Sequence, residues 1–400
     1  MTWLTAAQTL QILGVRPQTL YANVSRKRLR AKPDPRDSRR SLYHEGDVRR
    51  LERAQRGRRK TEAIATGTIE WGDPILSSSL STVSEGRLWY RGQDALALAE
   101  SRTLEEVAGL LWGCGAPMSS AVAGVPGRGA VRSHGGRRPR SGAPPLQAAF
   151  MALAARAGTD PSTSGRKLPD LQGDAAGVLA TLSGSFLGGA GTLALHARLA
   201  TAWHRKAAGD VLRRALVLLA DHELNASTFA ARVTASTGAP LSACVLAGLA
   251  ALSGPLHGRA AASVLRLTRA VSRHGARAAV QDCLAQGQPL PGFGHPLYPE
   301  GDVRAAALLA SFELPPEYVA LRYAVEELTG ERPNVDFALA ALTCVHDLPG
   351  EAPLILFALG RSVGWLAHAL EQAASGRLIR PRARYVGPTS ATPVAFQDEL

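Results

Sequence analysis

The chain has 400 residues, of which 46% are hydrophobic, 20% charged and 5% aromatic. This composition is typical of a globular protein with a large buried core, and it excludes disorder throughout the chain. The net charge of +13 is concentrated in residues 1–60, where 16 Lys or Arg stand against 5 Asp or Glu. Binding to an acidic partner is therefore expected of the N-terminal segment and not of the whole protein.

The four cysteines are scattered, at positions 114, 244, 283 and 344. Without Cys-x-x-Cys spacing they argue against a disulfide framework and a thiolate metal site, so we expect a reducing, cytoplasmic location. The longest uncharged run, Val233 to Leu256, contains Gly and Pro residues and favours two buried core helices over a membrane helix. The first residues lack the pattern of a signal peptide.

The first sixty residues predict a separate module. Thr5 is expected to cap a helix that ends at Gly14, and Pro17 to open a second, basic helix. Residues 33–43 are expected to form a β-hairpin, followed by a short helix at residues 48–51. The segment resembles the winged helix-turn-helix of the MerR and excisionase type. That resemblance implies a helix in the DNA major groove and phosphate contacts through Arg and Lys; a basic face used for protein contacts is the alternative.

The remainder of the chain is predicted to be mainly α. Residues 69–112 begin with extended chain and a turn at Glu85-Gly86, and they end in an amphipathic helix. Residues 114–147 are rich in Gly, Pro, Ser and Arg, which predicts a flexible surface segment. From Leu146 to Leu370 the pattern is that of helices separated by Gly and Pro.

Three short segments combine an ionisable side chain with Gly or Pro. They are residues 254–258 with His257, residues 291–295 with His295, and residues 333–337 with Asp336. Proton removal beside a thioester carbonyl needs a carboxylate base and a donor at the oxygen where charge develops. Asp336 suits the base, His257 that donor, and His295 a donor to a second carbonyl that traps the enol. Each residue taken singly is more often structural, as a hydrogen-bonded core histidine or a helix cap.

The region from Thr68 to Gly387 resembles the citrate synthase family. The matching segments, in chain order, are Leu88–Gly92, Thr103–Val107, Asp221–Thr228, Gly254–Gly258, Gly292–His295, Asn334–Phe337 and Gly360–Trp365. So many matches in the same order make the resemblance specific.

The resemblance implies that His257 and Asp336 enolise acetyl-CoA and that His295 polarises the ketone of oxaloacetate. It also implies that a His and three Arg bind the oxaloacetate carboxylates, and the matching residues are His222, Arg304, Arg361 and Arg380. The planar guanidinium can pair bidentately with a carboxylate, although a single Arg is more often a solvated surface charge. By resemblance Arg380 would reach the active site of the other subunit, so a homodimer is expected.

The expected organisation is a winged helix-turn-helix in residues 1–60 and two helical domains. The large domain takes residues 61–258 and 360–400, and the small domain residues 259–359. By resemblance the two domains close over substrate and exclude water. The expected reaction joins acetyl-CoA and oxaloacetate to citryl-CoA and hydrolyses it to citrate and CoA, with no metal and no bound cofactor.

Two other functions stay open. Use of propionyl-CoA would make 2-methylcitrate, and one extra methylene changes pocket energetics by only about 1–3 kcal/mol. A regulator of transcription is the second, in which the citrate-synthase-like body senses oxaloacetate, citrate or an acyl-CoA and the basic module binds DNA.

Overall fold

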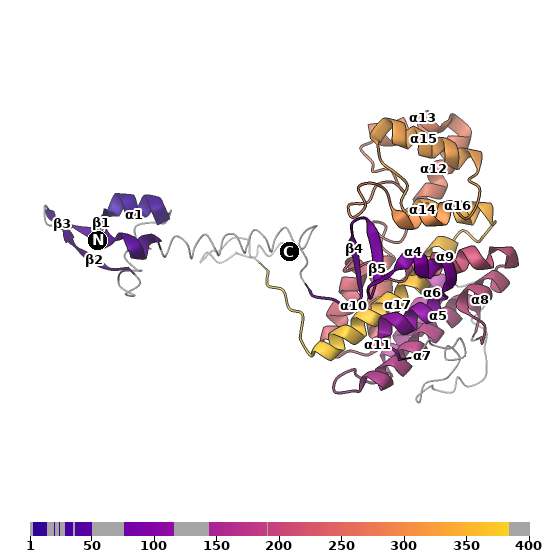
Figure 1. The fold of residues 1–400 in the computed structure, drawn as a ribbon, viewed down its shortest axis with the longest axis horizontal. Helices are drawn as coiled ribbons and strands as arrows, with labels where there is room; N and C mark the ends of the chain where they lie inside the picture. Colours follow the sequence, from indigo (N-terminus) through magenta and orange to yellow (C-terminus); the bar gives the residue numbers. More distant parts are fainter. Residues whose placement is uncertain are drawn as a thin grey trace, which may run out of the picture. The chain divides into compact units, whose positions relative to one another are not determined.

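The computed structural model divides the chain into two compact units, Met1–Ser77 and Ser78–Leu400 (Figure 1). The residues that the structure describes are 3–13, 20, 24, 29–34, 37–49, 76–115, 144–189 and 191–383.

The N-terminal unit contains a three-stranded antiparallel sheet and a short helix. Its elements are β1 (Trp3–Thr5), α1 (Ala6–Leu13), β2 (Ala31–Asp34) and β3 (Asp37–His44), with the strands in the order β1-β3-β2. The Thr5 hydroxyl accepts a hydrogen bond from the Gln8 amide, and the Gln8 side chain accepts one from the Thr5 amide. The predicted cap at Thr5 is confirmed, because these two bonds satisfy backbone groups at the start of the helix.

Parts of the predicted winged helix-turn-helix fall outside the described residues. The hairpin predicted at residues 33–43 is confirmed as β2 and β3, and residues 45–49 are helical. Of the second helix predicted from Pro17, only Leu20 and Val24 are described, and the basic run at residues 56–60 is not. The complete motif therefore stays a prediction.

The second unit begins with a small β-meander. Its strands are β4 (Ser81–Ser84), β5 (Arg87–Tyr90) and β6 (Gln93–Asp94). Glu85 and Gly86 form the turn between β4 and β5, with φ of 54° and 72°, and the predicted turn is confirmed. Positive φ at both residues is typical of the two-residue turns that fit the twist of β-hairpins. The buried Tyr90 hydroxyl donates toward backbone carbonyls at the end of helix α9 (Gly209–Leu219) and just after it, including that of Asp221 at 3.2 Å. The meander therefore holds the backbone beside His222.

Most of the second unit is helical, as predicted. One group of helices comprises α4 (Ala95–Ser101), α5 (Leu104–Trp112), α6 (Pro145–Ala157), α7 (Leu168–Leu187), α8 (Leu195–Ala202), η2 (Lys206–Ala208), α9 (Gly209–Leu219), α10 (Ala226–Ser236), α11 (Leu241–Leu252) and α17 (Ala352–Ser375). Within it, α17 packs against α5, α7, α9, α10 and α11 (Figure 1). Of the segment predicted to be flexible, residues 114–147, residues 116–143 lie outside the described residues, and residues 145–147 belong to α6.

A second group of helices lies beside the first. It comprises α12 (Ala260–His274), α13 (Ala276–Ala285), α14 (Val303–Leu309), α15 (Pro316–Thr329) and α16 (Val335–Val345). Helix α14 contacts α9, and helices α12 and α16 contact α17 (Figure 1). The second group therefore packs against the first through these three helices. The predicted boundaries of the large and small domains, at residues 258/259 and 359/360, stay a prediction.

The core helices of the second unit are closely packed. A Cβ added to Gly248 of α11 would lie 2.6 Å from the Trp365 ring of α17, so glycine is needed where these helices meet. The uncharged run from Val233 to Leu256 forms the end of α10 and all of α11, which confirms the prediction of two core helices. Helix α17 is long and apolar enough to cross a membrane, but 94% of its most apolar stretch is buried inside the fold.

Candidate active site

Four segments that are distant in the sequence meet at the candidate site. His222 follows α9, His257 lies between α11 and α12, His295 lies between α13 and α14, and Asp336 is in the first turn of α16. The rings of His222 and His295 meet edge to face with centroids 5.0 Å apart. Burial, then the charges of Arg304 and Arg361, lower the pKa of His222 well below its usual range.

The segments of His295 and Asp336 are hydrogen-bonded to each other. The Asn334 amide donates to the Gly292 carbonyl at 2.8 Å, and the Gly294 amide donates to the Arg332 carbonyl at 2.9 Å. Gly292 has a φ of 84°, and a Cβ there would lie 2.5 Å from the Val264 side chain, so no other residue fits without a shift. This pairing fixes the backbone of one predicted catalytic residue relative to the other.

His257 is oriented by Ser227. Its Nε2 lies 2.9 Å from the Ser227 Oγ, which also accepts a hydrogen bond from the Trp365 indole at 3.2 Å. Burial, then the charge of Arg361, lower the pKa of His257 to about 4. The imidazole is therefore neutral at pH 7, and it can act as a hydrogen-bond donor through one ring nitrogen only.

The hydroxyl of Ser227 contacts three groups. It donates to the Asn225 Oδ1 at 2.8 Å, accepts from the Trp365 indole at 3.2 Å and lies 2.9 Å from the His257 Nε2. Donation from His257 to a substrate requires the ring proton on Nδ1, and Ser227 must then turn its proton from Asn225 to Nε2. The Asn225 Oδ1 also accepts from the Thr228 amide at 3.1 Å, so it keeps one hydrogen bond in that arrangement.

His295 is half-buried and held by its own backbone. Its Nδ1 accepts a hydrogen bond from the Leu297 amide at 3.2 Å. The neutral ring therefore carries its proton on Nε2, which is the form that can donate to a carbonyl oxygen. Burial, then the charge of Arg304, lower the pKa of His295 to about 4.

Asp336 has the properties of a base held ready for a proton. Its amide is capped by the Asn334 side chain at 3.0 Å, and its Oδ1 is buried without a hydrogen-bond partner among the described residues. Burial raises its pKa to about 6, and Arg304 opposes that rise. An unpaired carboxylate oxygen of raised pKa is typical of a general base.

Arg304 and Arg361 are both buried, but only one has a carboxylate partner among the described residues. Arg304 donates from Nε and Nη2 to the two oxygens of Asp302, at 3.0 and 2.8 Å. Arg361 donates from Nε to the Leu219 carbonyl at 3.0 Å, while its Nη2 is buried with no described partner. Burial lowers the pKa of Arg361 to about 10, so it remains cationic at pH 7. A buried cation with an open donor favours an anionic ligand.

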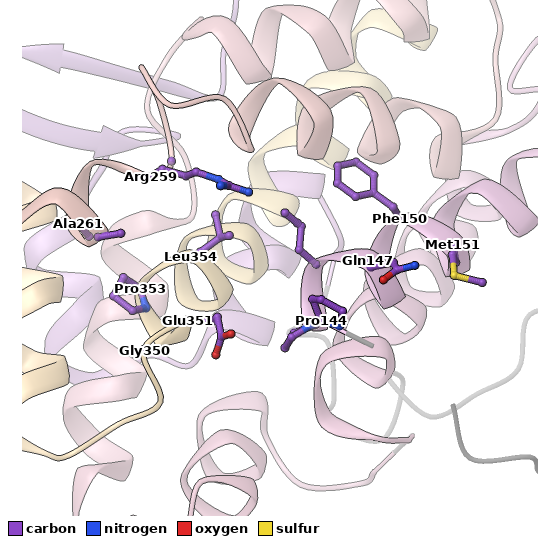
Figure 2. Close-up of a pocket in the computed structure, with 14 residues that line it drawn as sticks. Pro144, Gln147, Phe150, Met151, Arg259, Ala261, Gly350, Glu351, Pro353 and Leu354 are labelled. Carbon is purple, nitrogen blue, oxygen red and sulfur yellow. The ribbon is translucent and has the colours of Figure 1, made fainter. Parts of the chain in front are cut away.

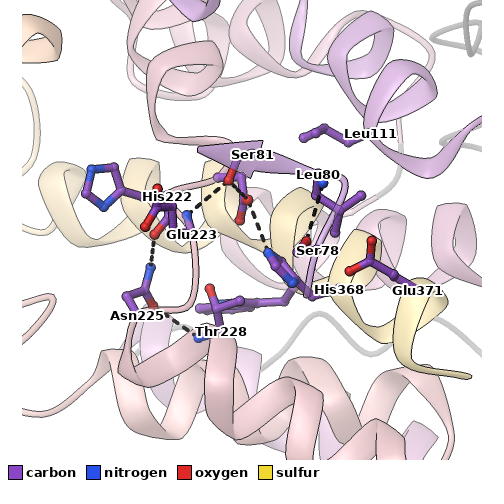
Figure 3. A network of polar contacts seen from close by, with 12 residues as sticks. Ser78, Leu80, Ser81, Leu111, His222, Glu223, Asn225, Thr228, His368 and Glu371 are labelled. Atoms are coloured by element: carbon purple, nitrogen blue, oxygen red, sulfur yellow. Dashed lines mark hydrogen bonds and ion pairs between the residues drawn. The ribbon is translucent and has the colours of Figure 1, made fainter. Parts of the chain in front are cut away.

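A polar network lies beside the backbone of His222, through its neighbours Asp221 and Glu223 (Figure 3). The neighbouring Asp221 accepts from the Ser81 hydroxyl at 2.5 Å and contacts the His368 Nε2 at 3.2 Å. The Ser81 oxygen also accepts from the Glu223 amide at 3.0 Å. Glu223 has a φ of 51°, which is unusual for a residue with a side chain, and its hydrogen bonds compensate for that strain.

The network continues through α10 and α17. Arg232 of α10 donates to the Glu371 carboxylate at 2.8 Å and lies 3.1 Å from the His368 Nδ1. His368 therefore accepts on Nδ1 and carries its proton on Nε2, toward Asp221. His368 and Arg232 were not among the residues predicted from the sequence. A buried histidine in a helix gives no sign of its partners until the helices are packed.

The structure does not bring Arg380 to the other candidate residues. It is exposed and lies beyond Ser375, where α17 ends. Arg361 is 14 residues before that end, which corresponds to about 21 Å along a helix. Figure 1 shows the chain leaving α17 away from the helices.

A cavity of about 540 Å³ lies beside the turn that carries His257 (Figure 2). Its lining is formed by Pro144, Pro145, Leu146, Gln147, Phe150, Met151, Gly258, Arg259, Ala261, Ala262, Gly350, Glu351, Pro353 and Leu354. Figure 2 shows the Arg259 side chain extending into this mostly apolar space. The large cation at position 259 is therefore accommodated there, and His257 keeps its contact with Ser227.

Metal chemistry was not expected from the sequence. Among the described residues, no group of three or more His, Cys, Asp or Glu side chains is arranged to hold a metal ion.

The chain is similar to citrate synthases over most of its length. Residues 70–382 match the family model described as the C-terminal domain of citrate synthase. A protein named putative citrate synthase 2 from Mycobacterium tuberculosis is 43% identical over 190 residues, which cover 44% of this chain and 51% of that protein. The citrate synthase of Haloferax volcanii is 43% identical over 185 residues, covering 43% of this chain and 49% of that one. The chain thus spans about half the length of the curated relatives it matches.

Solved structures extend this similarity. The crystal structure of citrate synthase from Thermotoga maritima has a TM-score of 0.63 at 27% identity, covering 81% of this chain and 96% of that chain. The citrate synthase from Thermoplasma acidophilum, in a ternary complex with carboxymethyl coenzyme A and oxaloacetate, has a TM-score of 0.65 at 25% identity, covering 80% and 96%. The ordered motifs, the helical fold and these matches agree, and the chain belongs to the citrate synthase family.

Proposed function

We propose that the protein condenses acetyl-CoA with oxaloacetate to citryl-CoA and hydrolyses that thioester to citrate and CoA. The observation that carries the proposal is the Asp336 carboxylate, whose buried Oδ1 has no hydrogen-bond partner among the described residues and whose pKa is raised to about 6. Two imidazoles that are neutral at pH 7, His257 and His295, support the proposal, because the charge of Arg361 acts on both of them and on Asp336. A base and two neutral donors are what an enolisation followed by attack on a ketone needs.

The first step removes a proton from the methyl carbon of acetyl-CoA. Asp336 takes that proton, and the electron pair of the broken C–H bond moves toward the thioester carbonyl. The Nδ1–H of His257 donates to the carbonyl oxygen, where negative charge develops. Ser227 supports this role because it contacts the other nitrogen of the same ring at 2.9 Å.

The second step forms the carbon–carbon bond. The enol carbon attacks the ketone carbon of oxaloacetate, and the ketone oxygen gains charge and is protonated to a hydroxyl. His295 donates to that oxygen from Nε2, because its Nδ1 accepts from the Leu297 amide. Water then attacks the thioester carbonyl of citryl-CoA, and the C–S bond breaks to release CoA and citrate.

The oxaloacetate carboxylates need cationic or donor groups, and we assign His222, Arg304 and Arg361 to them. Arg361 supports this best, because its buried Nη2 has no described partner. The ternary complex of the Thermoplasma acidophilum relative with oxaloacetate and a CoA derivative is consistent with the same pair of substrates here.

The test is release of the CoA thiol by the full-length protein with oxaloacetate and either acetyl-CoA or propionyl-CoA. We expect turnover with acetyl-CoA, and Asp336→Asn is expected to lower kcat by at least about a thousandfold, because the base is lost. A folded protein with no turnover of either acyl-CoA contradicts the proposal. A kcat/KM higher for propionyl-CoA would favour 2-methylcitrate synthesis, the activity named for a relative from Shewanella oneidensis that is 35% identical.

We also propose a homodimer in which Arg380 serves the site of the partner, with the small domain, residues 259–359, closing over substrate. The exposed position of Arg380, beyond the end of α17, supports its assignment to the site of the partner. Mixing Asp336→Ala and Arg380→Ala subunits tests it. Each variant alone lacks one group at both sites, whereas a mixed dimer regains one complete site. Activity that does not rise on mixing and reassembly contradicts a shared site.

For the N-terminal segment we propose DNA binding by residues 1–60. Support comes from the capped helix α1, from the hairpin of β2 and β3, and from the charge of residues 1–60, where 16 basic residues stand against 5 acidic ones. The full-length protein is titrated with duplex DNA at low and high salt, and we expect affinity to fall as salt rises. No affinity at low salt would remove this proposal.

A cytoplasmic location is proposed as well, since all four cysteines lie among the described residues and are unpaired.

A further inference from the structure

Tyr298 lies between three of the residues assigned to substrate. It is only 2% exposed, and its hydroxyl is 3.0 Å from the Nε2 of His222. Its ring centroid is 5.1 Å from that of His295, and the Arg304 guanidinium carbon lies 5.4 Å from the same ring.

The backbone gives Tyr298 a fixed position relative to His295. The Tyr298 amide donates to the His295 carbonyl at 2.9 Å, and the Gly301 amide donates to the Tyr298 carbonyl at 2.9 Å. Two consecutive turns therefore present both rings, with Pro296 and Pro299 restricting the backbone of the segment. A side chain held this firmly can orient a neighbour.

Hydrogen-bond accounting indicates the direction of the contact with His222. If the His222 Nε2 carried the ring proton, Tyr298 would accept, and the proton of its hydroxyl would have no acceptor among the described residues. If Tyr298 donates, Nε2 accepts, both groups are satisfied and the ring proton lies on Nδ1. Burial raises the pKa of Tyr298 to about 12, so the hydroxyl keeps its proton.

We propose that Tyr298 is a positioning residue that donates to His222 Nε2 and thereby fixes His222 as an Nδ1–H donor for a carboxylate-bearing substrate. The inference rests on the proposed function for the identity of that substrate, oxaloacetate. Tyr298 acts through His222 and through the spacing of His222 from His295. It takes no part in proton transfer to carbon.

Tyr298→Phe is the direct test, because it removes only the hydroxyl. We expect the KM for oxaloacetate to rise about tenfold, the effect of losing one buried hydrogen bond, while kcat and the KM for acetyl-CoA stay within about twofold. The matched control is Tyr318→Phe, which removes a hydroxyl that is equally buried and donates to the Ala340 carbonyl at 3.1 Å, away from these histidines. The control is expected to lower stability without changing either KM.

A second measurement does not depend on turnover. Nitrogen-15 NMR of the histidine rings, with the His222 signals identified by their loss in His222→Gln, reports which nitrogen carries the proton. We expect the proton on Nδ1 in the wild type and a mixture of both forms in Tyr298→Phe. A wild-type proton on Nε2, or an oxaloacetate KM that Tyr298→Phe leaves unchanged, overturns the proposal.

The NMR measurement and a binding measurement, neither of which depends on turnover, separate this inference from the proposed function. Oxaloacetate binding is also titrated by calorimetry without acyl-CoA, with the same tenfold loss expected for Tyr298→Phe. A wild type that releases no thiol but shows the Nδ1 proton and this loss of affinity contradicts the proposed reaction and supports the role of Tyr298.

Discussion

Asp302 holds Arg304 through both of its carboxylate oxygens, with nitrogen–oxygen distances of 3.0 and 2.8 Å. The oxygen that accepts from Arg304 Nη2 also accepts from the Val335 amide at 3.0 Å. One carboxylate thus connects the arginine assigned to oxaloacetate with the first turn of α16, where Asp336 lies. The two roles, binding and proton removal, share an electrostatic partner.

Asp302→Asn should shift the acid limb of the pH profile of kcat/KM to lower pH. The negative charge of Asp302 raises the pKa of Asp336, which is about 6, and Arg304 lowers it. Activity needs the ionised base, so it rises with pH through this value. Without the Asp302 charge, the limb is expected below pH 6. A pH profile of thiol release measures it, and a limb that stays in place or moves upward contradicts the electrostatic coupling.

Asp336→Asn should stabilise the protein at alkaline pH while abolishing activity. The folded pKa of about 6 exceeds the usual 3.8, so the charged form costs stability that builds up as pH rises from 3.8 to 6. The cost above pH 6 is about 3 kcal/mol. Thermal unfolding should show a higher Tm for the variant at pH 8, and the difference should shrink as pH falls toward 4.

Asp174→Asn is the control for that experiment. Asp174 is ion-paired with Arg166 on the outside of the fold, so its neutralisation is expected to bring no gain in Tm at pH 8. An equal gain in both variants would mean that a general reduction of negative charge is responsible, and not the burial of Asp336.

Ser227→Ala should slow the enolisation step. The variant removes the partner of His257 Nε2 and leaves the Trp365 indole without its acceptor. We expect kcat to fall about tenfold with little change in the KM for oxaloacetate, since Ser227 orients a donor that acts on acetyl-CoA. Steady-state kinetics with each substrate varied measure this. Ser242→Ala is the control: its buried hydroxyl has no described partner, and kcat should be unchanged.

Gly364→Ala should disrupt the backbone at His222. A Cβ there would lie 2.3 Å from the Asp221 Oδ1 and 2.4 Å from the Ala220 carbonyl. The Asp221 carboxylate is held through Oδ2 by Ser81 and His368, and the Ala220 carbonyl accepts from the Gly364 amide, so a shift of either group breaks hydrogen bonds. We expect the free energy of unfolding, measured in urea, to fall by roughly 3 kcal/mol or more. This is the upper end of the range for substitutions that overpack a core. Gly173→Ala, on the exposed face of α7 with no atom within 4 Å, should instead gain up to about 1 kcal/mol. Equal effects of the two variants would contradict the packing argument.

Local features of the fold were predictable from the sequence. The cap at Thr5, the turn at Glu85-Gly86 and the two helices in the run from Val233 to Leu256 follow from neighbouring residues alone, because caps, turns and helix breaks are set within a few positions. The hairpin at residues 33–43 was predictable for the same reason.

Contacts between distant segments were not predictable by the same means. Ser227 lies in a segment that matched the family, but its contact with His257 depends on how α10 packs beside α11. Asp302 and Tyr298 likewise gain their roles only when their loop folds against Arg304 and His222. The roles of the seven predicted site residues stay predictions, although the structure places six of them around one site and leaves Arg380 outside it.

The hydrogen bonds between residues 292–294 and 332–334 carry a consequence for how the protein can evolve. They join the segments of the proposed base, Asp336, and the proposed ketone donor, His295, through paired backbone. The cavity lined by Arg259 contains no residue of these two segments, so substitutions in it are expected to leave their pairing unchanged. A lineage can explore new acyl groups while its central chemistry is preserved.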